Sequence, residues 1–307
     1  MPPALTSLTA MTSPAAPFGR VLTAMITPFT EDGGLDLPGA QALADHLVTQ
    51  GNDGLVISGT TGEAPTTSDA EKADLLRAVV DAVGGRAHVL AGVGTNDTAH
   101  SVELARTAEK AGATGLLAVT PYYSRPPEAG VLAHTERLAG ATSLPVMLYD
   151  IPGRSAIALS HGLLVRLAGH PQVVALKDAK DDLVATSRLL ADTGLPVYCG
   201  TDALDLPLLA IGGVGFVSVV SHVVTPQLVQ MVQAHEAGDT GRATALHLGL
   251  QPVFDGLFRT QGVILTKAAL RLLGLPAGPV RLPLVDATED QVTVLRQDLA
   301  AGGVLAA

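Results

Sequence analysis

The chain has 307 residues, a length that a single α/β barrel domain can fill. Its net charge is −10, without any cluster of Lys and Arg, which excludes the basic face that nucleic acids and anionic membranes bind. No apolar run approaches the ~20 residues of a membrane span, and the first positive charge is Arg20, unlike the basic start of a signal peptide. We therefore expect a cytoplasmic protein with no nucleic-acid or membrane partner.

Hydrophobic residues make up 47 % of the chain but aromatic residues only 3 %, so the core is expected to consist of Ala, Val and Leu. Many small apolar layers suit a barrel interior. The single cysteine, Cys199, excludes an internal disulfide, and its place at the end of an apolar run predicts a buried hydrophobic residue rather than a redox thiol. The histidines are scattered without the spacing of a zinc site, so we expect no metal and no organic cofactor.

In chain order, residues 1–17 are rich in Pro, Ala, Ser and Thr and predict a flexible tail. From Arg20 onward, short apolar runs recur, each followed by Gly, Thr or Pro and then a helical pattern: 21–27, 54–58, 88–93, 115–120, 145–150, 173–177, 196–199 and 215–220. Continuous rather than alternating hydrophobicity indicates strands buried on both faces, and the segments between them are long enough for parallel crossovers. Eight such units predict a (β/α)8 TIM barrel over residues 18–238.

Helix signals fill the intervening segments. Ser68 and Glu71 have the spacing of a capping box, and Gly112 follows a helix that should end near Lys110. After residue 238, Ala, Leu and Arg segments such as 266–273 replace the strand-like runs, which predicts a C-terminal helical subdomain over residues 239–307. Lys267 lies in such a segment, and we expect it at the surface with its stem covering apolar atoms.

Lys177 stands at the end of the sixth apolar run. A period of two places it on the same face as Val173 and Ala175, and that face should line the barrel. Lysine is rarely buried unless paired, and burial disfavours a charged amine, leaving the neutral nucleophile that imine chemistry requires. The alternative is a buried ion pair with Asp178, which is disfavoured because successive strand residues point to opposite faces.

Polar residues follow two other predicted strands, at the end of the barrel where active sites form. Residues 59–63, Gly-Thr-Thr-Gly-Glu, permit a tight turn that offers hydroxyl and N–H groups to a small carboxylate, although an ordinary turn remains the alternative. Tyr149 ends the fifth run and could shuttle protons, and Arg154 could clamp a carboxylate. A capped core tyrosine and a solvated arginine are the alternatives for these two residues.

Together these residues resemble the dihydrodipicolinate synthase family, within the superfamily of pyruvate-dependent Schiff-base aldolases and lyases. The similarity runs from about Arg20 to Leu284 and rests on five motifs in order: 59–63, 119–123, 149–154, 176–179, and 200–202 preceding 215–220. Five ordered motifs are more specific than any one of them. The resemblance implies condensation of pyruvate with L-aspartate 4-semialdehyde to 4-hydroxy-tetrahydrodipicolinate, in the diaminopimelate route to lysine.

The resemblance also implies the catalytic roles. Lys177 would form the imine with pyruvate, and Thr60, Tyr149 and Tyr123 would relay protons. Tyr123 would reach in from a neighbouring subunit, which implies a homo-oligomer, expected as a tetramer built from a dimer of dimers.

The same carry-over assigns substrate contacts. Thr61 and Thr60 would hold the carboxylate of pyruvate, Arg154 that of the aldehyde, and the carbonyls near Gly200 and Val217 would line the pocket. A lyase for N-acetylneuraminate or a 2-keto-3-deoxy sugar acid would share the imine chemistry, but Arg154 favours an aldehyde that bears a carboxylate. A non-catalytic barrel that binds a keto acid is the alternative from another class, and it would need no nucleophile.

Regulation is the last property that the resemblance addresses. Sensitive members of the family bind lysine at the dimer interface through an acidic residue, paired histidines, an asparagine and a tyrosine. Asn96 and Tyr122 match this pattern, but the acidic position is His100, and the histidine positions are Asp69 and Lys72. Because the charges that would hold an amino acid are rearranged, we expect weak or absent inhibition by lysine.

Overall fold

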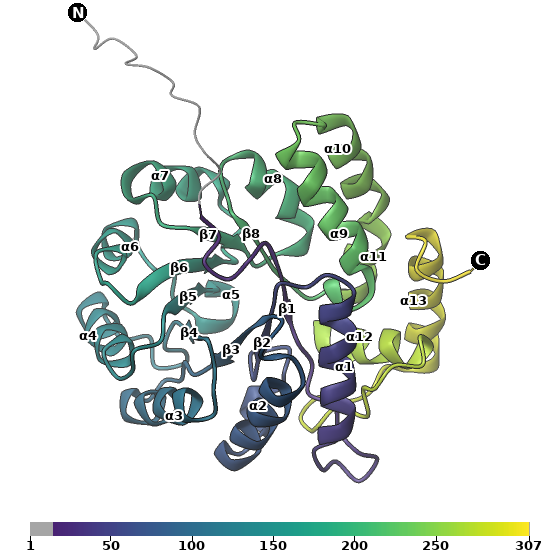
Figure 1. Cartoon of the computed structure of the whole chain (residues 1–307), viewed down its shortest axis with the longest axis horizontal. Helices are drawn as coiled ribbons and strands as arrows, with labels where there is room; N and C mark the ends of the chain where they lie inside the picture. Colours follow the sequence, from purple (N-terminus) through teal and green to yellow (C-terminus); the bar gives the residue numbers. More distant parts are fainter. Residues whose placement is uncertain (1–14, 307) are drawn as a thin grey trace, which may run out of the picture.

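The fold is a closed barrel of eight parallel strands that pair in sequence order, seen in a computed structural model that describes residues 15–306 (Figure 1). The strands are β1 (Val21–Ala24), β2 (Gly54–Ile57), β3 (His88–Gly92), β4 (Gly115–Val119), β5 (Val146–Asp150), β6 (Val173–Asp178), β7 (Val197–Cys199) and β8 (Gly215–Ser218). Each predicted apolar run coincides with one strand to within a few residues. The predicted TIM barrel is therefore confirmed.

The helices that follow the strands surround the barrel or, like the short α5, lie over its opening (Figure 1). They are α1 (Leu37–Thr49), η1 (Ala64–Thr66), α2 (Asp69–Val83), α3 (Thr98–Lys110), α4 (Glu128–Ala139), α5 (Pro152–Ser155), α6 (His161–Ala168), α7 (Leu183–Thr193), η2 (Asp202–Leu204), α8 (Asp205–Ala210) and α9 (Ser221–Glu236). The predicted capping box is present: the Ser68 hydroxyl accepts from the N–H of Glu71, and the Glu71 carboxylate accepts from that of Ser68. Gly112 follows α3 with a φ of 89°, as a glycine C-cap requires.

Two hydrophobic clusters separate the inside of the barrel from the helical layer. The inner cluster contains Tyr149 and Ala175, and the outer one joins alternate strand residues to the helices. The prediction that Val173 shares the inner face with Lys177 is wrong, because Val173 belongs to the outer cluster. The β5–β6 register shifts between Val146 and Met147, which pair with Val173 and Ala175, so the period of two is broken at the start of β6.

The amino-terminal end of the barrel is closed by aromatic residues. Tyr198 of β7 is fully buried, and its hydroxyl accepts from the N–H of Phe18 at 3.1 Å and donates to the carbonyl of Gly19 at 2.9 Å. Ala16 packs against the same inner cluster. Residues 1–14 of the predicted tail lie outside the described residues.

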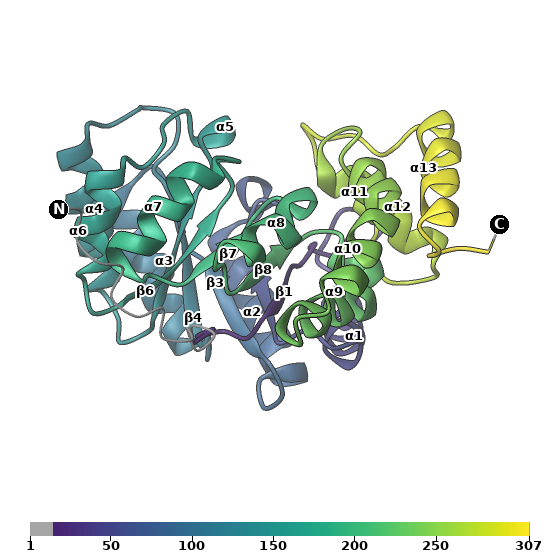
Figure 2. The same cartoon turned by 90° about the horizontal axis from the view of Figure 1, so that it is seen from above.

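Four helices follow the barrel: α10 (Thr240–Gly249), α11 (Gln251–Leu257), α12 (Gly262–Leu272) and α13 (Glu289–Ala301). Figure 2 shows α11, α12 and α13 beside the barrel, next to α9 and α10. The buried Leu265 and Leu295 belong to the outer cluster that also contains residues of α1 and α9. The C-terminal helices therefore share a core with the barrel wall. The segment 266–273 is helical, as predicted.

The prediction of a surface position for Lys267 is wrong. Its side chain is 0 % exposed and pairs with Glu63, with 2.7 Å between Nζ and Oε1. The helical pattern of α12 gives no sign of this, because the covering groups come from the turn after β2 and from the chain after α12. Burial lowers the pKa of Lys267 to about 8. Cys199 is buried at the end of β7, as predicted.

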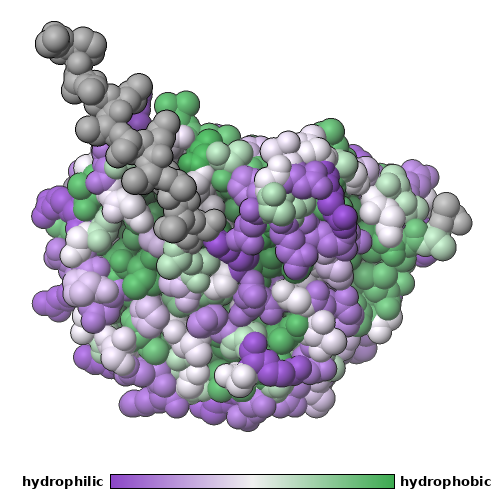
Figure 3. Space-filling model, turned by 45° about the horizontal axis from the view of Figure 1, so that its top comes forward, coloured by the Kyte–Doolittle hydropathy of each residue, from purple (hydrophilic) through white to green (hydrophobic). Residues whose placement is uncertain are grey.

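The outer surface mixes polar and apolar residues. On the face shown in Figure 3, hydrophobic residues occur in groups between hydrophilic ones. Among the helices of residues 15–306, none combines the length and apolar character that crossing a membrane requires.

Candidate active site

Lys177 and Tyr149 meet at the carboxyl end of the barrel. They are direct partners in the register of β5 and β6, so both side chains point inward from neighbouring strands. Lys177 is 5 % exposed, and its Nζ lies 4.3 Å from the centroid of the Tyr149 ring. Asp178 instead accepts from the Thr186 hydroxyl at 2.6 Å, on the other side of the strand. Lys177 is thus a buried amine beside a phenol.

A glycine makes room for the Lys177 side chain. A Cβ at Gly200, directly after β7, would lie 3.0 Å from Cε of Lys177 and 3.0 Å from Cβ of Ala179. Both contacts are tighter than ordinary packing, so a larger residue here would displace the lysine. Val217 of β8 is fully buried in the inner cluster, so its side chain contributes to the floor of the barrel rather than to an open surface.

The turn after β2 brings a threonine to the same region. Thr60 is partly exposed and lines a cavity of about 660 Å³ together with Tyr149 and Arg154, whereas Thr61 is buried. The same cavity is also lined by the residues that the resemblance linked to lysine binding, Asp69, Lys72, Asn96, His100 and Tyr122. Tyr149 therefore connects Lys177 with this cavity, because it contacts Lys177 and lines the cavity together with Thr60 and Arg154.

Arg154 lies between two cavities. It is exposed on the short helix α5, after β5, and it also lines a second cavity of about 920 Å³. Gly200, Lys180 and Phe258 line this second cavity, which opens between the barrel rim and α11. A guanidinium in this place can reach a carboxylate that enters from either side.

Tyr123 is a predicted site residue whose side chain points away from the site in the single chain. Its side chain is 86 % exposed, and its backbone has a φ of 73°, a left-handed conformation that a tyrosine rarely adopts. The neighbouring Tyr122 lines the first cavity, but Tyr123 lines neither cavity. Within residues 15–306, no group of three or more His, Cys, Asp and Glu has the arrangement of a metal site.

Comparison with known proteins identifies the family. Residues 17–302 match the Dihydrodipicolinate synthetase family. The chain belongs to this family. A relative from Streptomyces coelicolor named 4-hydroxy-tetrahydrodipicolinate synthase 2 is 64 % identical, over 95 % of this chain and 98 % of its own length. The resemblance inferred from five motifs is thereby confirmed over nearly the whole chain.

Solved structures of the family have the same fold. DHDPS from Cyanidioschyzon merolae with lysine bound superposes with a TM-score of 0.93 at 41 % identity, covering 95 % of this chain and all of that one. A structure described as the first monomeric dihydrodipicolinate synthase variant has a TM-score of 0.91 at 35 % identity, over 94 % of this chain and 98 % of that one. Assembly is therefore not uniform among the proteins that share this fold.

Sequence reasoning missed a charged cluster behind the dihydrodipicolinate synthetase family motifs. Asp150 follows Tyr149 and is fully buried, with Oδ2 accepting from the N–H of Leu159 at 3.1 Å and lying 3.5 Å from Nζ of Lys180. Nζ of Lys180 also lies 3.8 Å from Asp178. The sequence did contain a signal for this cluster. Asp150 directly follows Tyr149, Asp178 directly follows Lys177, and Lys180 lies two positions after Asp178.

Asp150 predicts a pH dependence of stability. Burial raises the pKa of its carboxyl from 3.8 to about 6, and the charge of Lys180 opposes this shift. Between pH 4 and 6 the unfolded chain has released this proton while the folded protein still holds it, so the carboxyl makes folding less favourable as pH rises. Relative to the native protein, the unfolding free energy of Asp150→Asn should therefore rise by roughly 2 kcal/mol between pH 4 and pH 7.5.

Urea unfolding of both proteins at the two pH values checks this expectation. Asp81→Asn is a matched control, because Asp81 is an exposed residue of α2. The difference in unfolding free energy between Asp81→Asn and the native protein should be the same at both pH values. A difference for Asp150→Asn that is equally independent of pH would contradict the raised pKa.

Proposed function

We propose that this chain is a 4-hydroxy-tetrahydrodipicolinate synthase that acts in the cytoplasm and condenses pyruvate with L-aspartate 4-semialdehyde. The observation that carries the proposal is the inward-facing Lys177 in register with Tyr149 at the carboxyl end of the barrel, in a chain that belongs to the dihydrodipicolinate synthetase family. A sensor that only binds a keto acid would need neither a buried amine nor a phenol next to it.

The proposed reaction begins at Nζ of Lys177. The neutral amine adds to the ketone carbon of pyruvate, the carbonyl oxygen leaves as water, and one proton taken up in this step gives a cationic imine. The positive charge makes the methyl protons acidic, and loss of one gives an enamine that attacks the aldehyde carbon of the second substrate. The amine of that substrate then attacks the imine carbon, closes the ring and releases Lys177. Tyr149, Thr60 and the Tyr123 of a neighbouring subunit carry the protons.

The proposed contacts with the substrates are those that the family resemblance implies, and three of the residues, Thr60, Arg154 and Gly200, line one or both of the two cavities. Thr60 and Thr61 hold the pyruvate carboxylate on the turn after β2, and the carbonyls near Gly200 and Val217 form the wall around the imine. Arg154 lies at the boundary between the cavities and binds the carboxylate of the aldehyde. A sugar-acid lyase would call for hydroxyl and carboxylate partners instead of this guanidinium.

The proposal predicts a covalent adduct. Borohydride in the presence of pyruvate should reduce the imine and add the mass of the reduced adduct to Lys177, located by peptide mass spectrometry. Lys177→Ala should lose the adduct and nearly all activity. Arg154→Ala should keep the adduct but raise KM for the aldehyde roughly ten- to a hundredfold, the equivalent of a charge-assisted hydrogen bond of about 1.5–3 kcal/mol. An adduct on another residue, or its loss in Arg154→Ala, would contradict these roles.

We also propose that the chain forms a tetramer built from a dimer of dimers. The exposed Tyr123 can take part in the reaction only if its side chain enters the active site of a neighbouring subunit. A left-handed backbone that displays an aromatic side chain to solvent is strained, and strain of this kind is often found at functional contacts. Since one solved relative is a monomeric variant, the assembly of this chain needs its own test.

Subunit complementation provides that test. Tyr123→Phe and Lys177→Ala are each expected to be nearly inactive, but their coexpression should restore roughly a quarter of native activity, because mixed dimers contain one complete site. Tyr149→Phe coexpressed with Lys177→Ala is the matched control and should restore nothing, since Tyr149 and Lys177 come from the same chain. A fully active monomer in sedimentation experiments would refute the proposal.

Weak inhibition by lysine is the last part of the proposal. His100 lies 2.9 Å from Asp69, and Lys72 donates to the carbonyl of Thr67. The Asp69 carboxylate and the Lys72 ammonium in the first cavity thus already have a side-chain or backbone partner, and Lys72 would repel the ammonium groups of lysine.

Steady-state kinetics at increasing lysine concentration measures this inhibition. Activity should remain above half at 1 mM lysine, a dissociation constant that corresponds to a binding free energy of about −4 kcal/mol. His100→Glu with Asp69→His restores the charge order of sensitive relatives and should increase the inhibition. Half-inhibition of the native protein at sub-millimolar lysine would show that the pocket is interpreted wrongly.

A further inference from the structure

The turn that carries Thr60 and Thr61 has a backbone that its own residues do not favour. Ser58 has a φ of 57° and Glu63 a φ of 55°, so a residue with a side chain adopts the left-handed conformation at each end of the turn. The turn is also closely packed, since a Cβ on Gly62 would lie 3.1 Å from the nitrogen of Ser58. Such a conformation persists only where surrounding contacts hold it.

Contacts hold the turn on two sides. On the inner side, the buried hydroxyl of Thr27, after β1, donates to the carbonyl of Gly62 at 2.6 Å. On the outer side, the carboxylate of Glu63 is 2 % exposed and has two partners from the C-terminal part of the chain. Its Oε1 lies 2.7 Å from Nζ of Lys267 in α12, and its Oε2 accepts from the N–H of Arg281 at 2.9 Å.

These two C-terminal residues are themselves fixed. Lys267 donates from Nζ to the carbonyl of Pro279 at 2.7 Å. Lys267 and Arg281 both contact the Phe29 ring, with Nζ 4.2 Å and Cζ 4.1 Å from its centroid. The Arg281 guanidinium also donates to the carbonyl of Thr66, in η1 directly after the turn, at 2.8 Å. Neither cation has much freedom to move away from Glu63.

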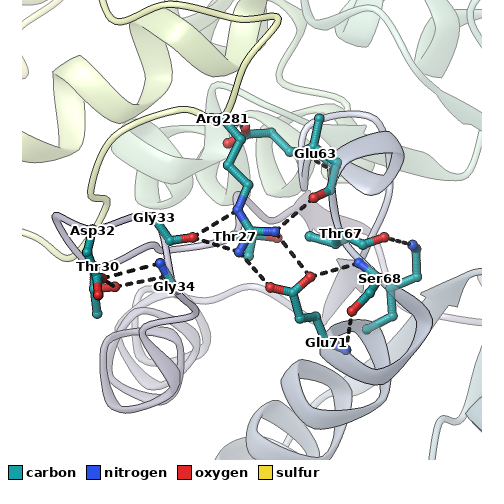
Figure 4. A network of polar contacts seen from close by, with 12 residues as sticks. Thr27, Thr30, Asp32, Gly33, Gly34, Glu63, Thr67, Ser68, Glu71 and Arg281 are labelled. Atoms are coloured by element: carbon teal, nitrogen blue, oxygen red, sulfur yellow. Dashed lines mark hydrogen bonds and ion pairs between the residues drawn. The ribbon is translucent and has the colours of Figure 1, made fainter.

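Arg281 connects the turn to the helix that follows it. Its guanidinium donates to both carboxylate oxygens of Glu71 at 2.6 and 3.1 Å, and to the carbonyl of Gly33 at 2.7 and 3.0 Å. Figure 4 shows Glu71 between Arg281 and Ser68, the N-cap of α2. The hydrogen bond from Arg281 lowers the pKa of Glu71 to about 2, so this carboxylate is charged at any working pH.

We propose that Glu63, Lys267 and Arg281 are positioning residues that hold the turn of residues 59–63 in the conformation in which Thr60 and Thr61 receive the pyruvate carboxylate. None of the three is expected to touch a substrate. Their contacts reach the reaction only through the backbone of the turn. This inference rests on the proposed function, because it takes pyruvate as the molecule that the two threonines bind.

A role in stability alone does not explain the arrangement well. A buried ion pair adds little net stability, because removing both ions from water offsets their attraction, and apolar residues of similar volume often replace it without loss. The pair instead fixes an orientation. Because both carboxylate oxygens of Glu63 have partners, its side chain is held in place, and its backbone is held with it. That residue lies two positions after Thr61.

The double variant Glu63→Gln/Lys267→Met tests the proposal. It leaves no unpaired buried charge, so it is expected to fold, while the amide can still accept from the N–H of Arg281. We expect its KM for pyruvate, and the pyruvate concentration for half-maximal borohydride labelling of Lys177, to rise by about tenfold or more. The labelling at saturating pyruvate and the KM for the aldehyde should stay close to native, since Lys177 and Arg154 are unchanged.

Arg271→Met is the matched control. Arg271 lies one turn after Lys267 on α12, pairs with Asp286 at 3.2 Å and donates to the carbonyl of Gly278 at 2.9 Å, without contact to Glu63. It removes a cation from the same helix, so its KM for pyruvate should be native. Thermal unfolding of all variants separates a loss of stability from a loss of pyruvate binding. If the three residues act only on stability, the double variant has a lower melting temperature but an unchanged pyruvate KM in the folded protein.

The outcomes distinguish the two proposals. If the native protein is not labelled at Lys177 with pyruvate and borohydride, the proposed function fails. If the native protein is labelled and turns over, but the double variant keeps a pyruvate KM within twofold of native, the positioning role is overturned. If the double variant does not fold, the single variant Glu63→Gln is measured instead. This variant avoids an unpaired buried charge, because Lys267 has a lowered pKa and can release its proton. An unchanged pyruvate KM in Glu63→Gln also overturns the proposal.

Discussion

The arrangement of the site depends on the register between β5 and β6. Because Tyr149 pairs with Lys177, two inward side chains of adjacent strands end at the same height, with the amine against the aromatic ring. The shift at Val146 and Met147 is what brings them level. A slip of one residue would turn Lys177 toward the helical layer, where an amine has no access to substrate. The barrel supplies this register through the pairing of all eight strands.

Much of the fold could be predicted because each signal was local. Strands buried on both faces leave continuous apolar runs, and capping residues such as Ser68 mark helix starts in the sequence itself. The face on which Val173 lies could not be predicted, since a bulge depends on the neighbouring strand. Lys267 shows the same limit, because the carboxylate that pairs with it lies some two hundred positions earlier in the chain.

The candidate site was predictable to the extent that it follows strand ends. Lys177 and Tyr149 lie at the end of an apolar run and Thr60 lies two positions after one, and the order of strands brings such positions to one rim. Asp150 and Lys180 lie at the same rim but face away from the interior, so a search for inward residues passes over them. Tyr123 could not be placed by any argument confined to one chain, since its side chain is exposed there.

The contacts of Lys267 and Arg281, which both lie over the Phe29 ring, have a consequence for chimeras made from two relatives. The chain after α12 and the turn after β2 are far apart in sequence, but each completes the hydrogen bonding of the other through Glu63 and Arg281. A chimera that joins the barrel of one family member to the C-terminal helices of another would cut through this contact. Recombination is therefore expected to succeed when both segments come from the same parent, and inheritance of the pair is a constraint on how such barrels diversify.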